Sequence, residues 1–412
     1  MTFSRLVLEK GNGICCAPLR IALVTVEFEG PTRNGGIGTA CRELASALRE
    51  VGHEVAVFFA GPFHHDNEEF WKCALALEGI EFTALQPHGI EDYNGQRRVI
   101  SAKACRWLKS RDFVVVHFHD WLGFGLDAVQ MKRAGTAFAD TLLCTTLHGP
   151  THWVDLGNEV SAPSPQRQEV ELAERWAVEG SDVVFSPSRF LLDEVIGRGW
   201  DVPRTRFVRQ NILGQSSPSL SVGVRTRPIT ELVFFGRLEK LKGLDIFCDT
   251  VDVLRAEAGD VRLTFLGRQN TIDGEDAASY IERRARRWHP PWRILSEMPR
   301  ERALAFLKVP GRCAIMPSHV ENSPYTVLEC IGRGIPFLAS SVGGTPELIR
   351  SDWRKAVLFQ NSPEDLCRAI KWILAEGAVI VPPEVPFEET RRQWLAWHSS
   401  LPRRRGMSAS SG

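Results

Sequence analysis

The chain has 412 residues, enough for two domains of ordinary size, and a content of 43% hydrophobic and 24% charged residues is typical of a soluble globular protein. Its 50 basic and 50 acidic residues cancel, so no net charge favours a nucleic acid partner. Ten cysteines without a Cys-x-x-Cys pair argue against a zinc site or a disulfide framework, and no apolar run reaches the ~18 residues of a membrane span.

A glycine-rich loop follows the first buried strand. The strand runs from Ile21 to Val26, the loop ends Gly35-Gly36-Ile37-Gly38, and apolar residues then repeat at helical spacing up to a second strand at 55–59. A glycine loop between a strand and a helix N-terminus is a geometry that binds phosphate. The dinucleotide fingerprint is incomplete, because Cys41 stands where the third glycine belongs and the second strand ends without an acid. A plain tight turn is the alternative interpretation.

Histidines stand at the ends of the next two strands. Val114–Val116 lead into His117, His119 and Asp120, and the strand at 141–147 ends at His148. His117 and His119 face one side of a strand, as two metal ligands do, but no third or fourth ligand lies nearby at metal spacing. The sequence therefore predicts no metal site. A further strand at 181–186 precedes Ser188, which is placed to cap the next helix.

Two cations follow the first strand of a second α/β unit. Residues 212–230 are rich in Ser, Pro and Gly, which predicts an interdomain linker before the strand at 232–235. Arg237 and Lys242 come next and could neutralise a phosphate group. Lys240 competes with Lys242 for the same role, and Gly243 adjoins Lys242. A solvated basic loop is the alternative interpretation.

The most informative segment runs from Glu321 to Glu329, between buried strands at 313–316 and 335–339. Strand, polar turn, helix and strand form one unit of a parallel sheet. Pro324 suits the first turn of the helix, and Ser323 is placed to cap it, so the free N–H groups of that turn could bind an anion. Glu321 lies in the turn, and Glu329 lies about two helical turns further on.

The two glutamates, together with Gly343-Gly344-Thr345-Pro346-Glu347, resemble the signature of retaining glycosyltransferases of the GT-B type, family 4. The resemblance extends to the double glycine of the first unit and to the Arg237–Lys242 segment. It implies an α/β fold with two Rossmann-like domains facing across a cleft and a C-terminal helix that crosses back to the first domain. The predicted parts are residues 1–210, a linker at 211–230, residues 231–385, a crossover helix at 386–400 and a disordered tail at 401–412.

The resemblance also implies roles for individual residues. Glu321 would orient the sugar hydroxyls, His148 would contact the sugar, and Glu329 would bind the ribose. The residues implied in catalysis are Glu321, His148, Arg237 and Lys242. Those implied in donor binding are Gly36, Arg237, Lys242, Glu321, Ser323, Tyr325, Thr326, Val327 and Glu329, and those lining the acceptor side of the cleft are Gly35, Gly38, His119 and Asp120.

The implied activity is that of a hexosyltransferase. It moves a sugar from a nucleoside diphosphate sugar, UDP- or GDP-linked, to a hydroxyl of a glycan, a lipid-linked acceptor or a small molecule, with retention and with neither metal nor cofactor. The expected location is the cytoplasm, with at most loose membrane attachment. Two alternatives remain open at this point: an epimerase or phosphorylase on the same fold, and a non-catalytic binder of sugar nucleotides.

Overall fold

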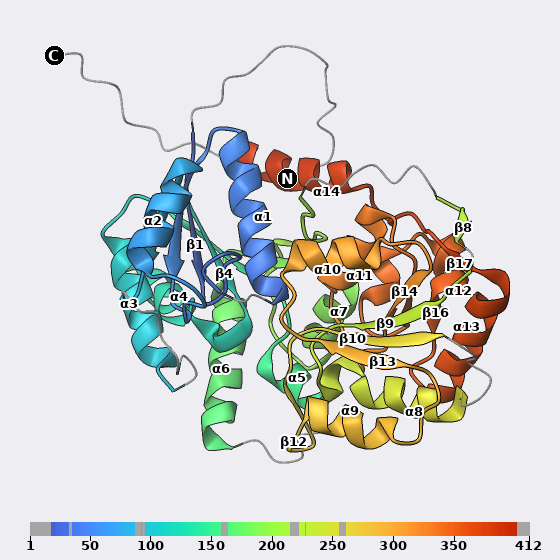
Figure 1. Cartoon of the computed structure of the whole chain (residues 1–412). Coiled ribbons are helices and arrows are strands. Elements are labelled where there is room, and N and C mark those ends of the chain that lie inside the picture. Colours follow the sequence, from blue (N-terminus) through green and yellow to red (C-terminus); the bar gives the residue numbers. More distant parts are fainter. Residues whose placement is uncertain are drawn as a thin grey trace, which may run out of the picture.

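The protein forms two α/β units that stand side by side, one coloured blue to green and the other yellow to red (Figure 1). The structure is a computed structural model, and it describes residues 18–32, 35–86, 92, 95–157, 164–214, 222–226, 228–254 and 261–401. The predicted tail, from residue 402 on, lies outside the described residues. The predicted two-domain α/β fold is confirmed.

The first unit contains a parallel sheet in the order β3-β2-β1-β4-β5-β6-β7. The strands are Arg20–Thr25 (β1), Glu54–Phe59 (β2), Ile80–Ala84 (β3), Val115–His119 (β4), Leu142–Thr146 (β5), Val183–Ser186 (β6) and Arg206–Val208 (β7). They are apolar along most of their length because helices cover both faces of such a sheet. The strand order reverses between β1 and β4, and sheets of this kind bind ligands at the carboxyl ends of the strands that flank the reversal.

Helices and short turns connect these strands. They are Gly36–Glu50 (α1), Glu68–Leu77 (α2), Arg97–Lys109 (α3), Trp121–Gly123 (η1, a 3-10 turn), Leu126–Arg133 (α4), Thr151–Gly157 (α5), Pro165–Gly180 (α6) and Arg189–Gly197 (α7). The Ser188 hydroxyl accepts from the N–H of Leu191 at 3.1 Å, so the predicted cap of α7 is confirmed.

The second unit contains a parallel sheet in the order β13-β10-β9-β14-β15-β16, which reverses between β9 and β14. Its strands are Glu231–Phe235 (β9), Arg262–Leu266 (β10), Trp292–Leu295 (β13), Arg312–Met316 (β14), Phe337–Ser340 (β15) and Leu358–Phe359 (β16). Its helical segments are Lys240–Lys242 (η2), Leu244–Leu254 (α8), Ala277–Ala285 (α9), Arg300–Leu307 (α10), Tyr325–Arg333 (α11), Thr345–Leu348 (η4), Ser351–Trp353 (η5), Arg354–Val357 (α12) and Pro363–Glu376 (α13).

Two small antiparallel pairs complete the second unit. Arg225–Thr226 (β8) pairs with Ala378–Val379 (β17), and Thr271–Ile272 (β11) pairs with Glu275–Asp276 (β12). Part of the predicted linker, β8, is therefore an edge of the second unit.

The last helix, Phe387–Ser399 (α14), returns to the first unit, as predicted, and lies beside α1 (Figure 1). Trp394 is 4% exposed and packs into the core of the first unit, and its indole N–H donates to the carbonyl of Gln210 at 2.9 Å. Arg391 forms an ion pair with Glu50 of α1 at 2.5 Å. Burial of Trp394 and the ion pair of Arg391 thus attach α14, which follows the second unit in the chain, to the first unit. Among the described helices, none is both long enough and apolar enough to cross a membrane.

Candidate functional site

Two charged side chains meet where the strand order of the second sheet reverses. Lys242 follows β9, Glu321 follows β14, and Lys242 Nζ lies 2.6 Å from Glu321 Oε1. The hydroxyl of Ser318 donates to the same oxygen at 2.8 Å. Both charged side chains stay partly exposed, Lys242 at 23% and Glu321 at 12%, so a ligand can reach the pair.

Arg237 stands at the same edge of the sheet. It follows β9 directly, is half exposed, and forms an ion pair with Glu239 at 2.9 Å. Lys240 turns to Asp273, with 3.4 Å between Nζ and Oδ1. The structure therefore brings Lys242, rather than its competitor Lys240, next to Glu321.

Gly343 and Gly344 allow the turn after β15 to lie against the turn that carries Glu321. Gly343 has a φ of +54°, and a Cβ at this position would lie 1.7 Å from the carbonyl oxygen of Glu321. A Cβ on Gly344 would lie 2.0 Å from the carbonyl oxygen of Asn322. The N–H of Gly344 also donates to the carbonyl of Glu321 at 3.1 Å. Larger residues would push the Glu321 turn away, which explains why two glycines follow β15.

The helix after Glu321 begins later than predicted. α11 starts at Tyr325, Pro324 occupies the N-cap position, and no side chain caps the helix. The prediction that Ser323 is the cap is therefore wrong, because Pro324 itself supplies the first helical carbonyl. The Ser323 hydroxyl is buried and has no hydrogen-bond partner among the described residues. A buried hydroxyl without a partner beside a helix N-terminus suits a ligand oxygen.

The first turn of α11 leaves two N–H groups open. The N–H groups of Val327 and Leu328 both donate to the carbonyl of Pro324, at 3.1 and 3.2 Å. Those of Tyr325 and Thr326 have no acceptor in the part of the chain that the structure describes. The phenol of Tyr325 points elsewhere and donates to the carbonyl of Ile212 at 3.0 Å. The N–H groups of Tyr325 and Thr326 are thus available to an anion, and that of Val327 is not.

Glu329 is buried deeper along α11 and has a cationic partner. Arg300 Nε, from the start of α10, lies 2.5 Å from Glu329 Oε1. The same guanidinium reaches Glu29 of the first unit at 3.3 Å. Burial raises the pKa of Glu329, and the Arg300 charge opposes that rise. The Glu329 carboxylate therefore already carries one strong bond.

In the first unit, the turn at His148 is fixed by a buried acid. Asp120 accepts from the N–H groups of Trp121, His148 and Gly149, at 2.8, 2.8 and 3.1 Å. Burial raises the pKa of Asp120 to about 6, against the effect of these bonds, and burial lowers the pKa of His148 to about 4. Asp120 was predicted to line the cleft, but its side chain is fully buried and holds the turn that carries His148.

Asn322 connects the two units at this point. Its side-chain amide donates to the carbonyls of Leu147 and His148, at 3.2 and 3.3 Å, and its oxygen accepts from Ser188 at 2.5 Å. Glu347 makes a second connection, because its carboxylate accepts from the N–H groups of Arg189 and Phe190 at 2.7 and 2.8 Å. A side chain of the second unit thus adds to the Ser188 cap of α7, and Asn322 links the turn of His148 to the segment that carries Glu321.

The glycine loop of the first unit faces the N-terminus of α11. A Cβ on Gly36 would lie 3.7 Å from a ring carbon of Tyr325. Glu27, at the start of the same loop, accepts from the N–H groups of Gly35 and Gly38 at 3.0 and 3.3 Å. Two of the N–H groups expected to meet a ligand are therefore already bound to an acid of the chain itself.

The ring of His119 lies next to that of His148. Its ring centroid is 4.7 Å from that of His148, and its Nε2 lies 2.9 Å from the sulfur of Cys41. A cavity of about 20 Å³ beside these side chains has room for no more than about one water molecule. His117 is buried and contacts His398 of α14 through the two Nε2 atoms, 3.0 Å apart. No group of three or more His, Cys, Asp or Glu side chains in the described residues could hold a metal ion.

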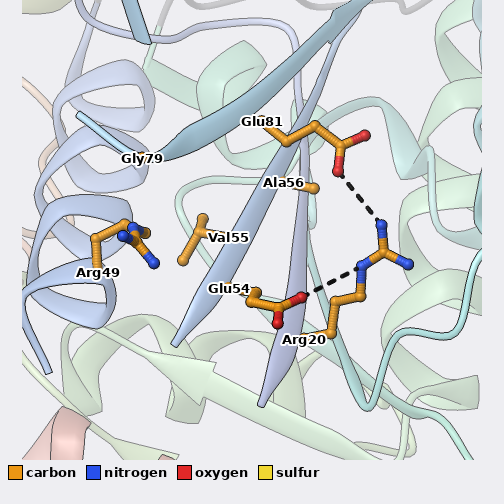
Figure 2. Close-up of a pocket in the computed structure, with 7 residues that line it drawn as sticks. All are labelled: Arg20, Arg49, Glu54, Val55, Ala56, Gly79 and Glu81. Atoms are coloured by element: carbon orange, nitrogen blue, oxygen red, sulfur yellow. Dashed lines mark hydrogen bonds and ion pairs between the residues drawn. The ribbon is translucent and has the colours of Figure 1, made fainter. Parts of the chain in front are cut away.

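A larger hollow, of about 200 Å³, lies at the opposite end of the first sheet (Figure 2). Figure 2 shows Arg20 between Glu54 and Glu81, at 3.9 and 3.4 Å, with Arg49 on the other side of the hollow. Glu54, Gly79 and Glu81 lie at or before the amino ends of β2 and β3. The acids balance the two arginines, and the hollow is far from the carboxyl ends of the strands, so it is not the candidate site.

Two family profiles match the chain. The family described as Glycosyl transferase 4-like domain matches residues 35–210, and Glycosyl transferases group 1 matches residues 230–376. The matches fall on the two α/β units. The first begins after β1 and includes Gly36 and His148, and the second includes Lys242, Glu321 and Glu329. The chain belongs to the GT-B glycosyltransferases.

Curated relatives of this GT-B glycosyltransferase include glycogen synthase of Mycobacterium tuberculosis, which is 27% identical over an alignment of 378 positions and is matched over 87% of each chain. A second relative is D-inositol 3-phosphate glycosyltransferase of Paenarthrobacter aurescens, 24% identical over 84% of this chain and 86% of the relative.

Solved structures share the fold. Sucrose-phosphate synthase from Thermosynechococcus elongatus has a TM-score of 0.61 at 17% identity, over 92% of this chain and 94% of that chain. Anabaena HepE, in complex with UDP and glucose, has a TM-score of 0.63 at 15% identity, over 93% and 100%.

Sequence reasoning missed three residues of this GT-B site. Arg300 lies outside every motif, so only the fold reveals its contact with Glu329. Asn322 stands inside the central motif, next to Glu321, and that position was an available signal. Glu27 is the acid that directly follows the first strand and precedes the glycines, a position that could have marked it as a partner of the loop.

Proposed function

We propose that the protein transfers a hexosyl group from a nucleoside diphosphate sugar to an acceptor hydroxyl, with retention of the anomeric configuration and without a metal ion. The observation that carries the proposal is the Lys242–Glu321 contact beside the open N-terminus of α11. A cation, a carboxylate and free backbone N–H groups thus lie together where the strand order of the second sheet reverses. Recognition of a charged diphosphate linked to a neutral sugar requires this combination.

The diphosphate would bind between the two units. Arg237, Lys242 and the N–H groups of Tyr325 and Thr326 supply positive charge and hydrogen-bond donors on the side of the second unit. Gly36, which faces Tyr325, allows the backbone of the first unit to approach closely. As the bond between the anomeric carbon and the phosphate oxygen breaks, charge develops on the diphosphate. Preorganised donors at such a position contribute ~2.7–4 kcal/mol each.

The sugar would lie between Glu321 and His148. Asn322 joins the turns that carry these two residues, so their separation is set by the fold. His148 is a neutral imidazole over most of the pH range, because burial lowers its pKa to about 4. A neutral imidazole can donate to or accept from a sugar hydroxyl without repelling the positive charge that develops on the sugar. Glu329 would bind the ribose through the carboxylate oxygen that Arg300 leaves open.

The acceptor oxygen would form its bond on the face that the diphosphate leaves, and its proton would pass to the departing phosphate oxygen. This route needs no protein base. Two features of the acids support it: Asp120 is saturated by three backbone N–H groups, and Glu321 is paired with Lys242.

The test has two steps. Thermal shift across a panel of nucleotide sugars should identify the donor, because a ligand at ~100 times its dissociation constant adds ~2.7 kcal/mol of stability. The product of transfer, analysed by NMR, should then keep the donor's anomeric configuration. Stabilisation by no nucleotide sugar would contradict the donor assignment, and an inverted product would contradict retention.

A further inference from the structure

An acid already occupies the loop that the donor is expected to approach. Glu27 accepts the N–H groups of Gly35 and Gly38, and both bonds end on the same oxygen, Oε2. Gly35 lies close to the whole carboxylate, since a Cβ there would be 3.1 Å from Oε2 and 3.4 Å from Oε1. One carboxylate oxygen therefore organises the start of α1, and the other is not used by these bonds.

The charged groups that face Glu27 come from both units. Arg237 and Arg268, which follow β9 and β10, lower its pKa, whereas burial raises it and dominates. On α1, Cys41 faces Glu27 as a neutral thiol, because burial raises the pKa of Cys41 to about 12. The neighbouring acid of the loop, Glu29, is directed to Arg300 instead. Glu27 is thus held by two backbone N–H groups, and it shares the charge of Arg237 with Glu239, the ion-pair partner of that arginine, and with the proposed diphosphate site.

We propose that Glu27 makes donor binding proton-linked: the side chain is ionised while the site is empty and takes up one proton from solvent when the donor's diphosphate binds. This inference rests on the proposed function. Two like charges that share one cation raise each other's proton affinity, so the weaker acid of the two is the one that becomes protonated. A nucleotide sugar's diphosphate is a far stronger acid than a carboxyl group, and the proton therefore goes to Glu27.

The geometry suits the protonated form. Protonated Glu27 can keep Oε2 as the carbonyl oxygen that accepts both N–H groups and can donate from Oε1 to a phosphate oxygen. The loop would therefore not need to rearrange when the charge is lost. Because a proton is taken up on binding, donor affinity should fall as pH rises through the window between the free and donor-bound pKa values of Glu27, by up to about tenfold per pH unit.

Calorimetry of the whole protein with UDP-glucose and GDP-mannose tests this inference. Titrations between about pH 6 and pH 9 in buffers of different ionisation enthalpy count the protons taken up. The phosphates of these probes are diesters and do not titrate in this range. The expected result is proton uptake that approaches one per bound donor within this range. Glu27→Gln should bind without uptake and with an affinity that no longer falls with pH, since its amide oxygen can still accept both N–H groups.

The matched control is Glu43→Gln. Burial also raises the pKa of Glu43, an acid of α1, but Glu43 faces Arg300 and the N–H of Gly214 rather than Arg237. Proton uptake should persist in this variant. Donor binding without uptake at every pH, or uptake that survives Glu27→Gln, would overturn the inference and leave the proposed function intact. Failure of every nucleotide sugar to bind would overturn both.

Discussion

The side-chain amide of Asn322 lies 3.3 Å from the carbonyl oxygen of His148, so the central turn of the second unit holds the histidine of the first. Asp120 holds the same residue from the other side, through the N–H of His148 at 2.8 Å. The peptide groups on both sides of His148 are therefore fixed by side chains from different units. The placement of His148 therefore depends on the contact between the two units.

Asn322→Ala should lower turnover at saturating donor, because His148 loses its link to the Glu321 turn. The variant also leaves the buried Ser188 hydroxyl without its acceptor, at a cost of ~1–3 kcal/mol. A double-mutant cycle with His148→Ala measures the coupling. We expect the double variant to be about as slow as His148→Ala alone, and fully additive losses would show that Asn322 does not act through His148.

The site residues should divide by the kinetic step that they affect. Glu321→Ala and His148→Ala should reduce turnover even at saturating donor, by ~10²–10³ where the contact strengthens in the transition state. Glu329→Ala should mainly raise the apparent KM for the donor, since ribose is bound alike in both states. Steady-state kinetics separates the two classes. Severe loss of turnover in Glu329→Ala with donor affinity unchanged would contradict the assignment.

Arg237→Ala should weaken binding of the free nucleoside diphosphate as well as turnover. Its guanidinium is half exposed and faces the place proposed for the phosphates. Lys240→Ala is the matched control, because this cation of the same loop is turned to Asp273. Calorimetric titration with UDP and GDP should show a loss in the first variant only, and equal affinities would remove Arg237 from the site.

The sequence predicted the parts of this site that single segments encode. Apolar runs located the strands, and the motif at 321–329 with its glycine turn placed Glu321 beside Lys242. Contacts between distant segments could not be predicted in this way. Arg300 and Glu329 are 29 residues apart, and Glu347, which adds to the Ser188 cap of α7, lies 158 residues after Arg189. The capping prediction failed at Ser323 because sequence rules do not fix whether the helix starts at Pro324 or after it.

Glu347→Gln should loosen the contact between the units. The carboxylate accepts two N–H groups at the start of α7 and interacts favourably with the helix dipole. The amide keeps one acceptor and loses the charge, so a loss of about 1 kcal/mol of unfolding free energy is expected. Glu364→Gln, in the first turn of α13 within the second unit, is the control for charge removal at a helix N-terminus. Equal losses in both variants would show that the connection between units adds nothing.

The contact between His117 and His398 should make the attachment of α14 sensitive to acid. His398 Nδ1 lies 2.8 Å from the carbonyl of Trp394, which requires a proton on Nδ1, so Nε2 must accept from His117 at 3.0 Å. Burial lowers the pKa of His398 to about 4, with a smaller contribution from His53, while an unfolded histidine titrates near ~6.5. The unfolded chain therefore binds this proton first as pH falls. The contribution to stability is complete above about pH 6.5 and is lost toward about pH 4, at up to ~1.36 kcal/mol per pH unit.

Thermal unfolding at constant ionic strength should show a shallower acid limb in His398→Gln than in the natural chain. The exposed His289→Gln variant should lose stability with falling pH as steeply as the natural chain does. If the natural chain and His398→Gln lose stability in parallel between pH 6.5 and 4, the histidine pair does not set the acid sensitivity of this helix.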